Sequence, residues 1–507
     1  MTPMDPHYAR ALEALGARGP GRMVPDLSRI TRLAQMLGDP QQAYPSIHVT
    51  GTNGKGSVVR MLGSLCSAAG LSAGTYTSPH LQTVRERLSL AGRPISEARF
   101  AEVHDEVAVL TDLLDQAARE ATGPDADQVT YFEQLTAMAY WWFADAPVDV
   151  GIFEVGMGGL WDATNLVRGD VAVINAIDLD HPQLGGTPAE VATEKAGIIK
   201  PGAYVVSAHQ QPEVAEVIAA AAERAGATLW LAGEDFEVAD RQVAVGGQLV
   251  SLRVGERTVD DILLPLFGQH QAGNAALALA AFVAFTGDSY TAMDDEVVRH
   301  GLGAAVVPGR LEIVHRNPTV VLDGAHNPHG ARASAAALDE SFGFRELVLV
   351  AACLEDKDVE GILREFRDVA SHVIVTSVDT PRAADVTRMR AAAVEVWDGT
   401  GTAVETAESV EAALELAETV VGDGDGILVA GSLHTVGAAR DRYVPVEATD
   451  DEIVLEPEDT DDVDDLDDLA HRMDGDLADE ADELSALLAD DDALQAALDR
   501  LIEDQAD

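Results

Sequence analysis

The sequence predicts an α/β protein whose helices cover mostly parallel sheets. Residues 48–62, HVTGTNGKGSVVRML, read as a β-branched strand, a glycine-rich turn and the start of a helix. Beyond them, short apolar runs alternate with helical stretches, which is typical of a parallel sheet covered on both faces. The alternation begins again after residues 301–309, GLGAAVVPG, which we interpret as a linker. We therefore expect a P-loop-containing N-terminal domain with a mostly parallel sheet and a smaller, Rossmann-like C-terminal domain.

The N-terminal part is expected to alternate strands and helices along its length. The apolar runs predict strands at 150–155, 171–175 and 204–208 and helices at 97–120, 130–144 and 212–225. Residues 235–265 change to short alternating strands with glycine turns, which indicates a small antiparallel patch. A helix over residues 270–286 then closes this part.

The C-terminal part repeats the alternation and then changes character. Strand-like runs begin at residues 312, 319, 347, 372 and 426, with helices between them. We expect domains at 1–302 and 303–446, followed by an acidic, largely disordered tail at 447–507, because the tail has too little apolar surface to order itself. Apolar residues recur there at near-helical spacing: Leu484, Leu488, Leu494, Leu498 and Ile502. Two interpretations stay open, a solvated tail with a marginal helix and a helix that docks a basic partner.

Composition excludes several classes of protein. The net charge of -53 argues against a nucleic-acid-binding surface, because such surfaces need clustered Lys and Arg. No stretch approaches the ~20 apolar residues that cross a bilayer, and the N-terminus lacks the pattern of a secretion signal. Cys66 and Cys353 are the only cysteines and suit reduced thiols. We expect a cytoplasmic monomer that binds neither nucleic acid nor membrane.

The glycine-rich turn predicts a nucleotide site. Gly51, Gly54 and Gly56 let the backbone form a nest of N–H groups at a helix N-terminus, which attracts anions, and Lys55 adds a mobile charge. The generic P-loop places Ser or Thr directly after the lysine, whereas here Gly56 separates Lys55 from Ser57. The alternative is a glycine-rich turn without a ligand.

Lysine usage singles out further candidates. Of the 34 basic residues, four are lysines, namely Lys55, Lys195, Lys200 and Lys357. A chain that uses Arg elsewhere is expected to keep Lys where a compact ammonium or a deprotonating amine is needed. Lys55 and Lys195 lie inside motifs, whereas Lys200 and Lys357 also fit chance surface positions.

Several polar residues after predicted strands are suited to bind Mg²⁺. Ser78 offers a hydroxyl, and Glu154 offers a carboxylate beside three glycines, with a strand-end ion pair as its alternative. Asp180 and His181 follow the next strand, and His181 is a candidate for a second metal ligand. Lys195 on the following helix is a candidate for carbamate formation with CO₂ if it is desolvated. The residues alone leave the roles of His181 and Lys195 open.

The motifs in this order closely resemble those of the folylpolyglutamate synthase and dihydrofolate synthase family, the folate branch of the Mur ligase superfamily. The resemblance covers about residues 5–445. Its motifs are TGTNGKGS (50–57), YTSPHL (76–81), TYFEQLTA (130–137), the EVG and DATN segments (154–165), LDH (179–181), EKAGIIK (194–200), GQHQAGNAALAL (268–279), PGRLEI (308–313), DGAHNP (323–328), DKD (356–358) and GSL (431–433).

The resemblance implies an ATP-dependent amide ligase that adds L-glutamate to dihydropteroate, to tetrahydrofolate or to both, through an acyl phosphate. ATP would contact Gly51, Thr52, Asn53, Gly54, Lys55, Gly56, Ser57, Asn274, Arg310 and Asp323, and two Mg²⁺ ions would be held by Ser78, Glu154 and His181. Catalytic roles would fall to Lys195, in carbamylated form, and to Asp323 and His326; an alternative for His326 is a structural turn residue paired with Asp323. The pterin substrate would meet Thr130, Tyr131, Phe132, Glu133, Trp161, Asp162 and Ala163.

Two departures and two alternatives accompany this interpretation. Leu160 and Trp161 stand where the family usually has Arg-Leu, which removes a cation near the pterin and adds an aromatic surface, and Asp178 replaces a usual glycine. A Mur-type peptide ligase of cell-wall synthesis is disfavoured, because only about 45 residues precede the P-loop, too few for a further substrate-binding domain. A non-catalytic ATP-binding protein is disfavoured by Glu154, His181 and Lys195.

Overall fold

The computed structural model describes residues 4–19, 25–179 and 182–446. The chain divides into two units, residues 1–450 and residues 451–507. The predicted ligand His181 and the predicted acidic tail, 447–507, lie outside the described residues. No helix of the described part is long and apolar enough to cross a membrane.

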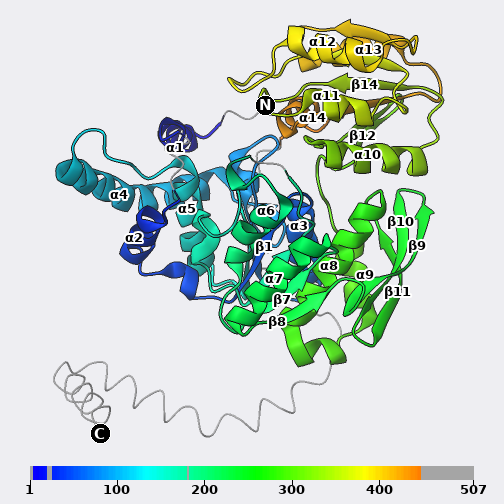
Figure 1. Ribbon diagram of the computed structural model, residues 1–507. Coiled ribbons are helices and arrows are strands. Elements are labelled where there is room, and N and C mark those ends of the chain that lie inside the picture. The colour runs from blue at the N-terminus through cyan, green and yellow to red at the C-terminus, as the bar shows by residue number, and fades with distance from the viewer. Residues whose placement is uncertain (1–3, 20–24, 180–181, 447–507) are drawn as a thin grey trace, which may run out of the picture. The chain divides into compact units, whose positions relative to one another are not determined.

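The first sheet has eight strands in the order β4-β3-β2-β5-β1-β6-β7-β8, as Figure 1 shows in part. From β2 to β8 neighbouring strands pair in parallel, whereas β3 and β4 form an antiparallel edge. Its strands are β1 (Ser46–Thr50), β2 (Ala73–Tyr76), β3 (Leu88–Leu90), β4 (Arg93–Pro94), β5 (Val150–Glu154), β6 (Val171–Ile174), β7 (Tyr204–Ser207) and β8 (Thr228–Leu231). The predicted mostly parallel sheet is confirmed.

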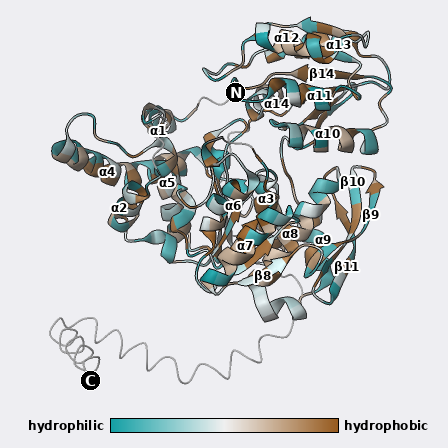
Figure 2. Ribbon diagram, in the orientation of Figure 1, coloured by the Kyte–Doolittle hydropathy of each residue, from teal (hydrophilic) through white to brown (hydrophobic). Residues whose placement is uncertain are grey.

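Helices cover both faces of this sheet because successive strand residues point to opposite sides. Val171 and Val173 of β6 join one core with α3, α8 and α9, whereas Ala172 and Ile174 join another with α6 and α7. A third core combines α1, α2, α4 and α5. The helices are α1 (Pro6–Ala17), α2 (Ser28–Met36), α3 (Lys55–Ala68), α4 (Glu97–Thr122), α5 (Tyr131–Asp145), α6 (Pro188–Lys195), α7 (Pro212–Ala225), α8 (Gln269–Thr286) and α9 (Asp295–Gly303). Hydrophilic residues occupy much of the long helix α4 (Figure 2).

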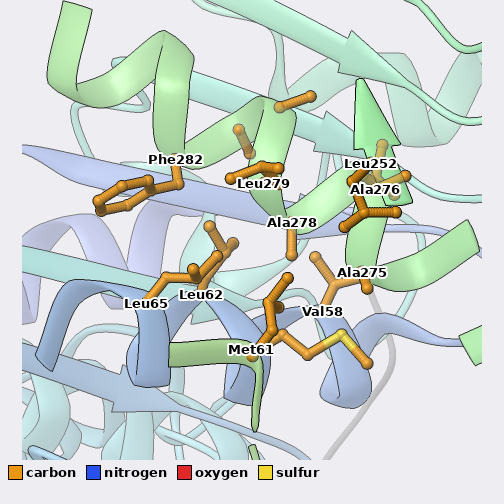
Figure 3. Packing of buried hydrophobic residues seen from close by; sticks show 14 of the residues in the cluster. Val58, Met61, Leu62, Leu65, Leu252, Ala275, Ala276, Ala278, Leu279 and Phe282 are labelled. Carbon is orange, nitrogen blue, oxygen red and sulfur yellow. The ribbon is translucent and has the colours of Figure 1, made fainter. Parts of the chain in front are cut away.

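Helix α3, which begins in the glycine-rich turn, is held by α8. Met61, Leu62 and Leu65 of α3 pack toward small residues of α8 such as Ala275 and Ala278 (Figure 3). Alanines on α8 let the two helices approach closely while still burying apolar surface. The start of α3 therefore rests on a rigid support. Short 3₁₀ helices complete the connections: η1 (Pro40–Gln42), η2 (Val84–Arg87), η3 (Ala163–Leu166), η4 (Pro182–Leu184), η5 (Ala196–Ile198) and η6 (Gly287–Ala292).

The predicted antiparallel patch forms a separate sheet of three strands in the order β11-β10-β9. These strands are β9 (Phe236–Ala244), β10 (Gly247–Val254) and β11 (Arg257–Leu264). One face of β10 packs on α8, because Val250, Leu252 and Val254 alternate with more exposed residues.

The third sheet has six strands in the order β12-β13-β17-β14-β15-β16, all parallel except the edge strand β12. Its strands are β12 (Glu312–Arg316), β13 (Thr319–Leu322), β14 (Leu347–Ala351), β15 (His372–Val375), β16 (Ala403–Thr406) and β17 (Gly426–Ala430). Helices α10 (Pro328–Ser341), α11 (Val359–Glu365) and α12 (Val386–Val396) cover one face, and α13 (Val410–Val420) and α14 (Leu433–Tyr443) cover the other. This arrangement is the expected Rossmann-like one. The division into domains at residues 302 and 303 stays a prediction.

The predicted linker at 301–309 is wrong at its start. Residues 301–303 form the last turn of α9. A Cβ on Gly301 would lie 2.9 Å from the Cα of Leu65, so this glycine allows α9 to approach α3 closely. The glycine serves helix packing here, and the connection between the sheets begins after α9.

Candidate active site

A cleft of about 1940 Å³ collects most of the predicted site residues. Its walls come from the loops at the carboxyl ends of the parallel strands of the first sheet, from β9 and α8, and from loops of the third sheet. Of the predicted residues, it is lined by Thr52, Asn53, Gly54, Lys55, Gly56, Ser57, Ser78, Thr130, Phe132, Glu133, Glu154, Trp161, Asp162, Ala163, Asn274, Arg310, Asp323 and His326. Gly51, Tyr131 and Lys195 are predicted residues that do not line it.

The glycine-rich turn has the backbone that its sequence predicts. Gly54 adopts φ +76°, directly before Lys55, the first residue of α3. A Cβ at Gly54 would lie 2.4 Å from Asn175 Nδ2 and 2.7 Å from Asn274 Oδ1, and those two atoms are themselves hydrogen-bonded at 2.8 Å. The Lys55 Nζ donates to Gly51 O at 3.1 Å. The turn is therefore packed against amides that fix its shape, and only glycine fits at its centre.

A buried carboxylate faces this turn. Glu154 ends β5, is 5% exposed, and its Oε2 accepts the backbone N–H of Ser78 at 3.0 Å. Burial raises the pKa of the Glu154 carboxyl, and Lys55 is the strongest of the groups that oppose this shift. Among the described residues, no group of three or more His, Cys, Asp and Glu side chains is arranged to bind a metal.

The third sheet contributes a second charged group. Asp323 follows β13, and its carboxylate accepts the N–H groups of Leu311 and Ala325, both at 3.0 Å. Burial raises the pKa of the Asp323 carboxyl, and the positive charge of Arg310 is the strongest influence that opposes this rise. The same guanidinium also opposes the rise in the pKa of Glu154, so Arg310 lies within electrostatic reach of both carboxylates. His326 Nδ1 lies 2.9 Å from Gly324 O.

The glycine-rich turn is in contact with the turn that follows β13. Asn327 Nδ2 donates to Asn53 Oδ1 at 3.0 Å, and Asn53 Nδ2 lies 3.1 Å from His329 Nδ1. Asn327 also caps α10 through the N–H of Gly330. Asn327 and His329 are residues of this contact that the sequence did not indicate as part of a site.

The far end of the cleft combines aromatic and acidic side chains. Glu133 and Thr130 form the capping box of α5, and Arg29 Nε donates to Glu133 at 3.1 Å. Trp161 is 46% exposed, whereas the neighbouring Asp162 is buried. The guanidinium carbon of Arg87 lies over the ring of Tyr131, 5.6 Å from the ring centroid. The outer part of this region is therefore an aromatic surface over buried carboxylates.

Comparison with known proteins matches both parts of the chain. Residues 49–282 match the Mur ligase middle domain, and residues 309–433 match the Mur ligase glutamate ligase domain. A dihydrofolate synthase/folylpolyglutamate synthase from Mycobacterium tuberculosis is 45% identical over 440 residues, which cover 83% of this chain and 90% of the relative. The chain belongs to the dihydrofolate synthase/folylpolyglutamate synthase family. It is an ATP-dependent ligase that attaches glutamate.

Further relatives agree with this family. The Bacillus subtilis dihydrofolate synthase/folylpolyglutamate synthase is 34% identical, over 82% of this chain and 95% of its own length. The structure of Mycobacterium tuberculosis folylpolyglutamate synthase complexed with ADP superposes with a TM-score of 0.81 at 43% identity, covering 86% of this chain and 98% of that one. The folate branch of the Mur ligases is therefore the correct branch, as the sequence motifs predicted.

Two of the ligase's lysines support loops behind the cleft. Lys195 is 4% exposed, and its Nζ donates to Gly51 O at 2.8 Å. Lys200 Nζ donates to both Asn165 O and Asn165 Oδ1 at 2.8 Å, and burial lowers the pKa of Lys200 to about 8. A chance surface position is therefore the wrong alternative for Lys200.

Asn175, the amide that packs against Gly54, is a further site residue that was not predicted. A signal was available, because Asn175 directly follows β6, and side chains at the carboxyl ends of parallel strands gather at one edge of the sheet.

Proposed function

We propose that this ligase uses ATP to phosphorylate the carboxylate of dihydropteroate or tetrahydrofolate, and that the amino group of L-glutamate then displaces phosphate to form an amide. A free carboxylate is a poor acyl donor, so the acyl phosphate provides the leaving group. One observation carries the proposal: the cleft brings Lys55, at the start of α3, and Arg310, in the connection before β12, to the same buried carboxylate, Glu154. Phosphoryl transfer depends chiefly on positioning and charge neutralisation.

The proposed nucleotide site uses the glycine-rich turn for the phosphates, with Lys55 and Arg310 opposing their charge and Asn274 near the base. Asp323 would hold Arg310 and nucleotide groups in place, and His326 would orient reacting groups or move a proton. Both lie on the turn after β13 and line the same cleft as Lys55.

We propose Ser78 and Glu154 as Mg²⁺ ligands. The hydroxyl and carboxylate oxygens are hard donors, and the desolvated Glu154 carboxylate gains most from a nearby cation. When held there, the ion would supply positive charge that neutralises the phosphates. His181, outside the described residues, is the third proposed ligand, for a second ion.

Carbamylation of Lys195 is a further proposal. Its amine is buried beside the glycine-rich turn, and Gly51, Lys55 and Asp178 line the same small cavity. A carbamate would replace a buried cation by an anion that binds metal. Incubation with isotopically labelled bicarbonate should give a carbamate signal by NMR that Lys195→Arg abolishes, and a signal that persists in this variant would contradict the proposal.

The acceptor is proposed to meet Thr130, Phe132, Glu133 and the turn at 161–163, with Tyr131 supporting that surface through Arg87. Trp161 offers an exposed ring for stacking on a pteridine.

We further propose that the enzyme works as a cytoplasmic monomer. Cys66 and Cys353 are both buried as free thiols, and burial raises the pKa of each to about 12, which suits a reducing compartment.

The decisive experiment incubates the purified protein with ATP, Mg²⁺ and L-glutamate plus either dihydropteroate or tetrahydrofolate, and weighs the products by mass spectrometry. We expect a glutamyl adduct with at least one acceptor, and phosphate released only when the acceptor is present. Glu154→Gln should abolish the adduct. Glu102→Gln, which changes an exposed carboxylate on α4, is the matched control and should retain it. No adduct with either acceptor would refute the proposed substrates.

A further inference from the structure

Strand β1, which leads into the glycine-rich turn, has an unusual buried face. Ile47 and Val49 pack into the apolar core with α3, as expected for alternate strand residues. The residues between and beside them are polar, yet Ser46, His48 and Thr50 are all fully buried at 0% exposure. Alternation places these three side chains on the same face of β1, and buried polar groups need partners. We call Ser46, His48 and Thr50 the β1 polar ladder.

All three rungs of the β1 polar ladder bond to one segment, residues 158–169. Ser46 Oγ accepts the N–H of Gly169 at 2.8 Å, and Thr50 Oγ1 donates to Gly158 O at 2.8 Å. Between them, His48 Nε2 lies 2.8 Å from Thr164 Oγ1. The segment includes the turn at 161–163, which lines the cleft. The strand that carries the phosphate-binding turn therefore also holds the turn at the acceptor end.

The middle rung has a defined direction of proton donation. Thr164 Oγ1 donates its only proton to Asp162 Oδ1, at 2.5 Å, so it accepts from His48. His48 consequently carries its proton on Nε2, and its Nδ1 is buried without a hydrogen-bond partner in the described part of the chain. The ring is fully desolvated, which lowers the pKa of His48 to about 3 and keeps the ring neutral. The chain of donation runs from His48 to Thr164 to Asp162.

This chain ends on a carboxylate that also accepts two backbone N–H groups. Asp162 Oδ1 also accepts the N–H of Thr164 at 3.0 Å, and Oδ2 accepts the N–H of Met157 at 2.9 Å. Because each oxygen has a fixed donor, the carboxylate cannot rotate freely. Loss of the Thr164 hydroxyl removes the only side-chain donor that this carboxylate has among the described residues, and it leaves His48 Nε2 without its acceptor.

We propose that His48 and Thr164 are positioning residues that fix the Asp162 carboxylate for the pterin part of the acceptor. The inference rests on the proposed function, in which the turn at 161–163 faces the acceptor. His48 and Thr164 themselves touch neither substrate. Their effect is specific to the acceptor, since the bonds to the glycine-rich turn from Lys55 and Lys195 are separate from this chain.

Equilibrium binding tests the inference without requiring turnover. The affinity for dihydropteroate and for tetrahydrofolate is measured by calorimetry, with a non-hydrolysable ATP analogue present, in the wild type, Thr164→Val and Thr164→Ser. Valine keeps the shape of threonine and removes the hydroxyl, whereas serine keeps the hydroxyl. Thr164→Val should weaken acceptor binding about tenfold or more, as expected for a lost hydrogen bond to a charged group. Thr164→Ser should restore it to within about threefold, and affinity for the ATP analogue should stay within about threefold of the wild type in both variants.

A double-mutant cycle distinguishes this role from a general packing defect. If Thr164 acts through Asp162, Thr164→Val should have little further effect in an Asp162→Asn background. His48→Gln, whose amide can still donate to Thr164, should fall between the wild type and Thr164→Val, and it is the second variant should Thr164→Val fold poorly by thermal melting.

The outcomes separate the two proposals. An active wild type whose Thr164→Val variant binds the acceptor normally, or loses ATP analogue and acceptor affinity equally, would overturn the positioning role and leave the proposed function intact. Additive effects in the cycle would also overturn it. A wild type that binds neither acceptor would overturn the proposed substrates, and the positioning role with them.

Discussion

Gly54 gives the sharpest test of the nucleotide site, because the structure shows what an added methyl group would meet. Its φ of +76° is one that L residues other than glycine rarely adopt. A Cβ there would lie 2.4 Å from Asn175 Nδ2 and 2.7 Å from Asn274 Oδ1. Gly54→Ala must therefore either move the turn or break the hydrogen bond between these amides, which is 2.8 Å long.

The size of the effect follows from two costs. Placing alanine in the left-handed region costs about 1–2 kcal/mol, and losing a hydrogen bond between neutral side chains costs about 1 kcal/mol. The sum of about 2–3 kcal/mol corresponds to roughly a 25- to 150-fold change in an equilibrium constant. The bound phosphates require the turn in the conformation that Gly54 allows, so we expect the cost to appear in nucleotide affinity. We expect Gly54→Ala to weaken binding of an ATP analogue by this factor.

The assay is isothermal titration with the ATP analogue, with urea unfolding measured in parallel. Gly70→Ala is the matched control, because Gly70 also has φ +76° but a Cβ there meets nothing within 4 Å. It should lose about 1–2 kcal/mol of the free energy of unfolding and keep its nucleotide affinity. Nucleotide affinity within about threefold of the wild type in Gly54→Ala would refute the reasoning, as would an equal loss in both variants.

Three other changes test separate parts of the site. Lys195→Arg should keep ATP-analogue affinity and lose most of kcat, because arginine forms no carbamate; an unchanged kcat would remove that role. Trp161→Ala should raise the KM for the pterin acceptor about fivefold, as expected for a lost aromatic contact, and leave the KM for ATP unchanged. An acceptor KM equal to that of the wild type would exclude stacking. The folded-state pKa of His48, about 3 against an ordinary 6.5, means that the unfolded chain binds the extra proton as pH falls below 6.5. Above pH 6.5 the neutral His48 ring therefore leaves the free energy of unfolding unchanged. Between pH 7 and pH 5, proton binding by the unfolded chain lowers that free energy by about 2 kcal/mol. Urea unfolding should show a smaller loss in His48→Gln, and identical pH dependence would contradict the assignment.

The sequence was most informative where chemistry and backbone are local. The nucleotide turn needs glycine for its backbone and lysine for its charge, so residues 51–57 identify it without any distant contact. The strands at 150–155, 171–175 and 204–208 followed from apolar runs that two-sided burial requires. Glycine misled the linker assignment, because Gly301 serves close packing of α9 on α3, which depends on residues far away in the chain.

The roles of polar residues were harder to predict because they depend on partners distant in sequence. His48 bonds to Thr164, 116 residues away, and nothing local in the sequence indicates that pair. Lys200 likewise depends on Asn165. Thr130 and Glu133, expected to contact the pterin, show the reverse: their spacing is a capping-box signature, and the structure uses their side chains for that cap. Their contact with the substrate stays a prediction.

The two ends of the cleft share supports, which has a consequence for binding. At the end of α6, Glu194 O accepts the N–H of Leu160 at 2.9 Å, and the next residue, Lys195, donates to Gly51 O at 2.8 Å. The acceptor-side turn and the nucleotide turn are thus tied to adjacent residues of one helix. Both also connect to β1: the segment 158–169 bonds along the strand, and the nucleotide turn follows its last residue. A ligand that moves Lys195 away from Gly51 acts on the residue directly after the one that anchors Leu160. Nucleotide and acceptor affinities should therefore depend on each other, and by linkage the effect of each on the other must be equal.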